Sequence, residues 1–263
     1  MSTATLSAPA DRSMRALPVF LHMDGVPATQ LKTQCSTCHL RELCLPCGMA
    51  APEVERLDQL VFTRRKIRSG QKLYREGDAF QYIYALRTGT FKSSLRTADG
   101  REQVSSLDMA GEVLGLDGVA TGVHASTSEA LEDSEVCAIP YAHLSELAAA
   151  NSGMQHVVTR LMGREIVREH GLMLLLGSMN AEQRLASFLL NLSKRLKARG
   201  YSATEFHLRM TRADIGSLLG MKLETVSRTF TVFQKRGLLE VDQRHIRIVD
   251  LSGLQHEFEI RMQ

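Results

Sequence analysis

Between residues 57 and 150, apolar and polar positions alternate in short runs that glycines interrupt at near-regular spacing. Gln81–Leu86 and Gly89–Leu95 are two such runs. The predicted turns are marked by Gly70, Gly77, Gly89, Gly100, Gly111, Gly115, Gly118 and Gly122. Short alternating runs are typical of strands, and evenly spaced turn residues indicate antiparallel pairing. This segment therefore predicts an antiparallel β-sandwich or β-roll.

The pattern changes at residues 152–178, which predict one long helix. Met162, Ile166, Glu169, Met173 and Leu176 follow one another at spacings of four and three residues. This is the heptad spacing of a coiled-coil seam rather than that of an ordinary amphipathic face. We expect a dimerisation helix, with the first four of these residues in the dimer interface.

Glu169 is the one charged residue in this seam. In a two-fold dimer the two Glu169 side chains would face each other, and like charges partly removed from water cost on the order of a kcal/mol or more. Such a dimer would be marginal, so a small conformational gain elsewhere could tip it. The alternative is that Glu169 points into solvent.

The C-terminal part of the chain predicts a winged helix-turn-helix. Thr211 and Asp214 resemble a capping box, with Asp in place of the usual Glu, and Gly220 supplies the turn. A second helix is expected from about Lys222 to Lys235, and residues 237–249 predict two strands around a tight turn, the wing. The expected buried face of the second helix is Leu223, Val226, Phe230 and Phe233.

A different, polar face of the second helix carries Glu224, Ser227 and Arg228. In helix-turn-helix proteins this half of the recognition helix presents side chains to base edges. Arginine can donate twice to guanine and glutamate can accept from cytosine, so the two suit one G·C pair. The alternative is a surface ion pair, because Glu224 and Arg228 are four residues apart on a helix.

The distribution of charge supports a nucleic-acid partner for the C-terminal part. Residues 102–159 contain no Lys or Arg against nine acids, whereas residues 193–247 contain twelve Lys and Arg against five acids. A basic module of this kind suggests DNA or RNA, although a merely solvated basic face has the same composition. Arg244, His245 and Arg247, in the predicted wing, are candidates for phosphate contacts.

Other classes of protein are disfavoured. No apolar run approaches the 18 residues of a membrane span, so no membrane partner is expected. Residues 1–30 lack the basic-then-apolar order of a secretory signal; we interpret them as a flexible tail and expect a cytoplasmic protein. No nucleophile–base pair, phosphate loop or paired-carboxylate motif is evident, so we do not expect an enzyme and assign no catalytic residues.

Four cysteines lie within thirteen residues, Cys35, Cys38, Cys44 and Cys47, with His39 among them. In a cytosolic chain this density favours metal over disulfides. Zinc, an iron–sulfur cluster and redox-reactive thiols are all compatible with thiol ligands, but five residues between the two pairs leave little room for a second zinc knuckle.

The order of parts resembles the cyclic AMP receptor protein superfamily and, within it, the fumarate and nitrate reduction (FNR) regulators. The resemblance covers about residues 30–255 and is specific at the C-x2-C-x5-C lead-in, at the lone Cys137 before Ala-Ile-Pro, and at Glu224-Thr-Val-Ser-Arg228. It implies an α+β fold with the domain order tail (1–30), cysteine lead-in and β-roll sensor (31–150), dimerisation helix (151–178) and winged helix-turn-helix (179–263).

The resemblance also implies function. A 4Fe–4S cluster would be held by Cys35, Cys38, Cys44 and Cys137, although Cys137 alone would be taken for a core residue and Cys47 lies outside the family pattern. The intact cluster would support a homodimer, oxygen would convert it to a 2Fe–2S form, and the dimer would loosen. Glu224, Ser227 and Arg228 would read a TTGAT…ATCAA-like palindrome, with RNA polymerase as a further partner.

Two rival regulators share the fold. A cyclic-nucleotide-responsive protein normally needs an Arg for the nucleotide phosphate, and the segment after Gly111-Glu-Val-Leu-Gly115 contains none. We therefore expect no cyclic nucleotide. The second rival senses redox state through zinc or thiols.

Overall fold

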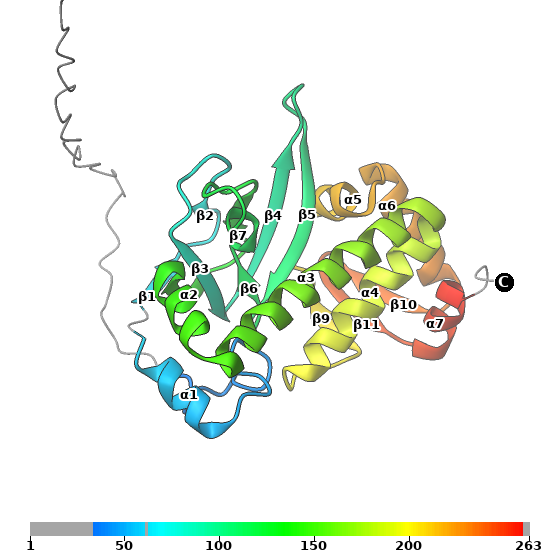
Figure 1. The fold of residues 1–263 in the computed structure, drawn as a ribbon. Coiled ribbons are helices and arrows are strands. Elements are labelled where there is room, and N and C mark those ends of the chain that lie inside the picture. Colours follow the sequence, from blue (N-terminus) through cyan, green and yellow to red (C-terminus); the bar gives the residue numbers. More distant parts are fainter. Residues whose placement is uncertain (1–33, 61–62, 260–263) are drawn as a thin grey trace, which may run out of the picture.

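The computed structural model describes residues 34–60 and 63–259, and the expected N-terminal tail lies outside them. A β-rich unit stands at one end and a mostly helical unit at the other (Figure 1). A long helix runs between the two and contacts both. Within the described ranges, no helix combines the length and the apolar character needed to cross a membrane.

The β-rich unit is a roll of two antiparallel four-stranded sheets. The first has the order β1 (Thr63–Ile67), β8 (Ser134–Pro140), β3 (Tyr82–Thr88) and β6 (Val113–Leu114). The second has the order β2 (Lys72–Tyr74), β7 (Thr127–Ala130), β4 (Thr90–Arg96) and β5 (Glu102–Met109). A short 3-10 helix, η1 (Leu116–Gly118), follows β6. The predicted antiparallel β-roll is confirmed.

Two short helices close one end of the roll, and alternation along the chain did not predict them. They are α1 (Ala51–Asp58) and α2 (Tyr141–Ala150). Val54 and Leu57 of α1 and Leu144 of α2 are fully or almost fully buried in one hydrophobic cluster. The second helix begins directly after Pro140, which ends β8. It is too short for a strong helical periodicity in the sequence.

The long helix is α3 (Ser152–Ser178), as predicted, and Asn151 caps its first turn by accepting a hydrogen bond from the Met154 N–H at 3.0 Å. One face of α3 is buried against the core through Met154, Val157 and Leu175. Another face is exposed and apolar, carried by Ile166, Val167, Met173 and Leu174, which are 54–70% exposed in the single chain.

The C-terminal unit is a winged helix-turn-helix. Its elements are α4 (Ala181–Ala198), β9 (Glu205–His207), α5 (Arg212–Leu219), α6 (Leu223–Lys235), β10 (Leu239–Asp242), β11 (His245–Ile248) and α7 (Leu251–Glu259). The predicted hairpin is β10–β11, and β9 adds a third strand that the sequence pattern did not predict. The predicted capping box is present, because the Thr211 hydroxyl accepts from the Asp214 N–H and the Asp214 carboxylate accepts from the Thr211 N–H.

The helix-turn-helix is seated on the β-roll through α5. The Lys92 ammonium of β4 lies 2.8 Å from the Asp214 carboxylate, and the Ser217 hydroxyl accepts from the Val104 N–H of β5 at 2.8 Å. Figure 1 shows α5 beside β5, partway along the β4–β5 hairpin. These contacts hold the helix-turn-helix in a defined position on the β-roll.

Candidate metal centre and nucleic-acid interface

A small cavity lies between the cysteine lead-in and the sheet strands β3 and β8. Four of the five cysteines line it: Cys35, Cys38, Cys44 and Cys137. Cys47 does not line it. The rest of the wall is mainly apolar, with two arginines at its edge: Leu40, Arg41, Leu45, Pro46, Ala85, Leu86, Arg87 and Ile139. The fold thus brings Cys137 to the three predicted ligands of the lead-in, which lie about a hundred residues earlier in the chain, and leaves Cys47 outside.

Consecutive turns shape the lead-in. The Cys38 N–H donates to the Cys35 carbonyl at 3.2 Å, the Cys44 N–H to the Leu40 carbonyl at 2.9 Å, and the Cys47 N–H to the Cys44 carbonyl at 3.0 Å. Backbone curvature of this kind brings side chains three to six residues apart onto one side of the loop.

Asp58 holds the backbone at Cys35, and strand β8 holds Cys137. The Asp58 carboxylate, at the end of α1, accepts from the backbone N–H groups of Cys35 and Ser36. Cys137 lies on β8 opposite Ala85 of β3 and is 8% exposed. The lone cysteine of the sequence is therefore held rigidly in the sheet, whereas the other three are carried by turns.

Burial raises the pKa of two of these thiols, Cys44 and Cys35. It raises the pKa of Cys44 to about 12, with the neighbouring thiols Cys137, Cys38 and Cys47 adding to the rise and the Leu45 backbone opposing it. Burial also raises the pKa of Cys35 far above its ordinary value, helped by Cys44 and Asp58. Because the thiolate is the metal-binding form, a strong positive partner is needed to deprotonate Cys35 and Cys44.

Cys47 has a different environment, on the surface of α3. The Arg164 guanidinium donates to the Cys47 sulfur at 3.5 Å, and Arg160 donates to the Cys47 carbonyl. Gly48 has φ +71°, and a side chain there would collide with Arg160. The last turn of the lead-in is thereby fastened to the long helix.

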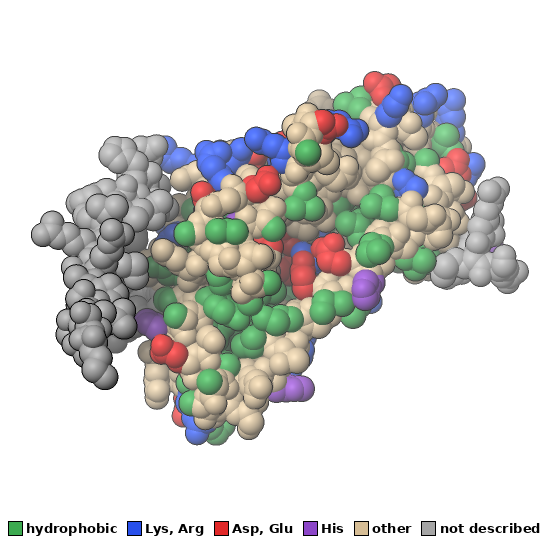
Figure 2. Space-filling view, turned by 45° about the horizontal axis from the view of Figure 1, so that its top comes forward, with side chains coloured by type: hydrophobic (Ala, Val, Ile, Leu, Met, Phe, Trp, Pro, Cys, Tyr) green, Lys and Arg blue, Asp and Glu red, His purple; other side chains and the backbone are tan. Residues whose placement is uncertain are grey.

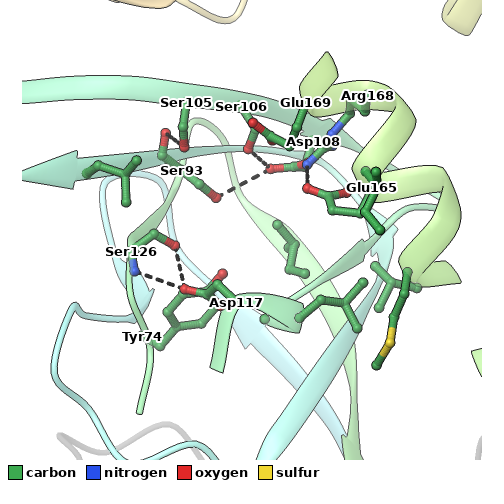
Figure 3. Close-up of a pocket in the computed structure, with 17 residues that line it drawn as sticks. Tyr74, Ser93, Ser105, Ser106, Asp108, Asp117, Ser126, Glu165, Arg168 and Glu169 are labelled. Atoms are coloured by element: carbon green, nitrogen blue, oxygen red, sulfur yellow. Dashed lines mark hydrogen bonds and ion pairs between the residues drawn. The ribbon is translucent and has the colours of Figure 1, made fainter. Parts of the chain in front are cut away.

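A larger pocket of about 360 Å³ lies inside the roll against α3 (Figure 3). Arg168 reaches into it from α3 and lies 2.6 Å from the buried Asp108 carboxylate and 2.5 Å from Glu165. Burial raises the pKa of Glu165, although Arg168 opposes the rise. Asp117 and Glu169 also line the pocket. Four carboxylates against one engaged arginine oppose the entry of a phosphate anion.

Replacing Arg168 with Met is expected to destabilise the fold by about 3 kcal/mol, because it leaves the buried Asp108 charge with only serine hydroxyls as partners. Urea unfolding at fixed protein concentration measures this. Arg101→Met, which removes an exposed ion pair to Asp99, is the control and should change little. Equal losses of stability for the two variants would mean that the ion pair between Arg168 and Asp108 contributes no more than an exposed one.

The predicted base-reading residues lie together at the start of α6. Glu224 and Arg228 are exposed and Ser227 is half-buried. In the described part of the chain, no ion pair joins Glu224 to Arg228. Figure 2 shows basic side chains over the upper edge of both the β-rich and the helical unit, and hydrophobic side chains along the hollowed face between them.

One prediction for α6 is wrong. Val226, Phe230 and Phe233 are buried as expected, but Leu223 is 46% exposed. Leu223 is the first residue of the helix and precedes the part that packs on α5. An exposed apolar group beside Glu224 can contact a thymine methyl, a possibility that the sequence analysis missed by assigning Leu223 to the core.

The three wing residues that are predicted to contact phosphate differ in their surroundings. His245 lies 3.1 Å from Glu205, and Arg247 lies 3.0 Å from Glu240. Arg244 is exposed next to Gln243, whose φ of 52° makes the tight turn between β10 and β11. Arg244 is therefore the best placed of the three for a phosphate.

Comparison with known proteins agrees with this architecture. Residues 183–257 match the Crp-like helix-turn-helix domain, and residues 64–151 match the cyclic nucleotide-binding domain. The transcriptional regulatory protein btr of Bordetella pertussis is 44% identical over 88% of this chain and 95% of its own length. The anaerobic regulatory protein of Haemophilus influenzae is 42% identical over 84% of this chain and 86% of its own length.

A third relative is the fumarate and nitrate reduction regulatory protein of Salmonella typhimurium, 40% identical over 84% of this chain and 88% of its own length. Among solved structures, FixK2 from Bradyrhizobium japonicum superposes with a TM-score of 0.70 at 30% identity, over 75% of this chain and 97% of its own. Identity of this level over nearly whole chains establishes the family. The chain belongs to the cyclic AMP receptor protein superfamily and, within it, to the branch of the fumarate and nitrate reduction regulators.

Proposed function

We propose that this protein is a DNA-binding transcription regulator of the anaerobic response, controlled by a 4Fe–4S cluster held by Cys35, Cys38, Cys44 and Cys137. The observation that carries the proposal is the cavity lined by these four thiols and not by Cys47. The names of the relatives from Haemophilus influenzae and Salmonella typhimurium support the anaerobic part. We propose no enzymatic role, and we place the protein in the cytoplasm because DNA is its partner.

The donor set fits a 4Fe–4S cluster. In such a cluster each thiolate binds a different iron, so the four cysteines that line the cavity would supply one ligand to each iron. Arg41 and Arg87 also line the cavity, and Arg41 is itself paired with Glu42 at 2.9 Å.

The cavity must widen before it can hold a cluster. Its volume is about 20 Å³, the room of about one water molecule. Cys137 is fixed in the sheet, so the lead-in turns that carry the other three ligands must move outward when the site is filled. When bound, the cluster supplies reactivity toward oxygen. The part played by the chain is to couple the position of these turns to the rest of the molecule.

The path for this coupling is the hydrophobic cluster that joins the lead-in to α3. Cys35, Cys44 and Cys137 pack in the same cluster as Met154 and Val157, on the first half of that helix. Arg160 and Arg164 attach the same segment to Cys47. An outward shift of the lead-in would therefore act on the first half of α3 through these contacts.

The exposed apolar face of α3 is the proposed dimer interface. Ile166 and Met173 are 54% and 68% exposed, Met162 and Glu169 are half-buried, and apolar side chains of this size in one row are typical of an interface. We propose that residues 151–178 are the dimerisation helix between a sensor of residues 31–150 and a DNA-binding domain of residues 179–263, and that the dimer is favoured when the cluster is intact.

In this dimer, Glu224, Ser227 and Arg228 of each subunit would read one half of a TTGAT…ATCAA-like palindrome, with half-sites about 10 base pairs apart. RNA polymerase is the proposed further partner. The acidic pocket of the roll, with Arg168 tied to Asp108, supports regulation without a cyclic nucleotide.

The test is a binding titration of the palindromic duplex with anaerobically prepared protein, repeated after exposure to air. A scrambled duplex is the control. The proposal predicts tight, sequence-specific binding before exposure and loss of specific binding after it. Equal affinity in both conditions would contradict control by oxygen, and equal affinity for both duplexes would contradict the assigned reading residues.

Replacing Glu169 with Ala is expected to strengthen the dimer in air, because it removes a like-charge pair that costs on the order of a kcal/mol across the interface. Sedimentation of the protein after loss of the cluster measures the change in dimer dissociation constant. Glu146→Ala, an exposed residue of α2, controls for the change in net charge. A dimer as weak as that of the control would place Glu169 outside the interface.

A further inference from the structure

Arg184, in the first turn of α4, connects two parts of the molecule that the proposed function needs to keep aligned. Its guanidinium donates to the Leu176 carbonyl at 2.7 Å and the Met179 carbonyl at 2.9 Å, at the C-terminal end of α3. It also donates to the Leu219 carbonyl at 2.9 Å and the Gly220 carbonyl at 3.3 Å, at the end of α5.

All four acceptors are at or next to helix ends. The last carbonyls of an α-helix have no partner within the helix and carry the negative end of its dipole. A guanidinium has donors in a fixed fork, so one side chain can satisfy two such ends and hold them at a defined angle. Lysine, with one nitrogen, cannot bridge the same set.

The place of Arg184 in the chain makes this contact a bridge. Only Met179 and Asn180 separate α3 from α4, and both have extended backbone conformations. This joint is the natural hinge between the dimerisation helix and the DNA-reading unit. On its far side Gly220, with φ +61°, forms the turn before the recognition helix α6.

Packing reinforces the bridge at the same point. A side-chain carbon added at Gly220 would lie 3.1 Å from the Leu176 side chain and 3.2 Å from the Arg184 guanidinium. The last turn of α3 therefore sits directly against the turn of the helix-turn-helix. A rotation of α3 about its axis would be transmitted to the start of α6 through this contact.

We propose that Arg184 is a positioning residue for DNA recognition: it locks the end of the dimerisation helix to the helix-turn-helix turn and so sets the spacing and angle of the two recognition helices in the dimer. This inference rests on the proposed function, namely that a dimer reads a two-fold site. It assigns the selectivity for half-site spacing to a residue that touches no base.

The test uses Arg184→Gln and Arg184→Lys in the full-length protein, prepared anaerobically. Affinity is measured for a duplex with both half-sites, for the same duplex with one central base pair inserted, and for a duplex with a single half-site. Lys194→Gln is the control, because Lys194 is an exposed cation on the same helix α4. Circular dichroism at the working temperature shows that each variant is folded.

For Arg184→Gln we expect the two-site affinity to fall about ten-fold or more, because the advantage of two linked contacts depends on their geometry. The single half-site affinity should stay within about two-fold of the original, since one reading unit needs no fixed partner. The penalty for the inserted base pair should shrink. Arg184→Lys should show the same pattern, which keeps the test valid if the glutamine variant does not fold.

Equal loss on the one-site and two-site duplexes, with an unchanged insertion penalty, would overturn the inference and leave Arg184 as a residue that only stabilises the DNA-binding unit. A different outcome identifies failure of the proposed function itself. If the original protein does not prefer two half-sites to one, the dimeric reading of DNA is wrong, and this inference falls with it.

Discussion

Replacing Arg228 with Ala is expected to weaken binding to the palindrome by orders of magnitude and to relax the preference at one base pair of each half-site. Arg228 is exposed in the first half of α6, four residues after Glu224. One good bidentate contact to guanine contributes about 1–3 kcal/mol of discrimination, and a dimer loses it twice. The measurement is competition binding over a series of single-base operator variants, anaerobically and at fixed salt.

Arg244→Ala is the matched control for this series. Arg244 is exposed in the wing turn, where a phosphate is its expected partner. Its removal should weaken every operator variant by a similar factor and flatten the salt dependence, because phosphate contacts carry no sequence information. If Arg228→Ala also weakened every variant equally, Arg228 would be a backbone contact and the assignment of α6 as the reading helix face would be wrong.

Single replacements of the cavity cysteines are expected to act in an all-or-none way. Cys35→Ala, Cys38→Ala, Cys44→Ala and Cys137→Ala should each abolish the cluster, because a 4Fe–4S cluster needs four protein thiolates. Cys47→Ala should retain it, because Cys47 lies outside the cavity and against Arg164. Iron and acid-labile sulfide, together with the visible absorbance of anaerobic samples, give the result directly.

The pair Cys137→Ala and Cys47→Ala is the informative comparison. Both remove one thiol, but Cys137 lies on β8, 8% exposed, and Cys47 lies on a turn against α3. Loss of the cluster in Cys47→Ala with retention in Cys137→Ala would make Cys47 the fourth ligand. Retention in both would mean that the two cysteines substitute for each other.

The chain's local patterns predicted those elements whose stability is local. The capping box of Thr211 and Asp214, the turn at Gly220 and the hairpin around Gln243 depend on neighbouring residues, and each is present. The long helix was also predictable, because 27 residues give many repeats of one period. By contrast, the three-residue strand β9 exists only because β11 pairs with it.

Most residues of the site were predictable from the sequence, but the tertiary contacts that position them were not. The clustering of Cys35, Cys38 and Cys44 is visible in the sequence, whereas Cys137 needs the pairing of β3 with β8 to reach them, and only a family resemblance indicated it. The ion pair of Arg168 with Asp108 spans 60 residues, and the bonds from Arg184 to Leu219 and Gly220 span 35 and 36. No periodicity records contacts of this kind, because they arise from tertiary packing.

The central claim is that the four thiols of the cavity hold an iron–sulfur cluster. The most direct test is the iron, zinc and acid-labile sulfide content of the full-length protein isolated without exposure to air. We expect about four iron and four sulfide per chain and a brown colour. Stoichiometric zinc without sulfide would contradict it and would leave a zinc or thiol redox regulator on the same fold.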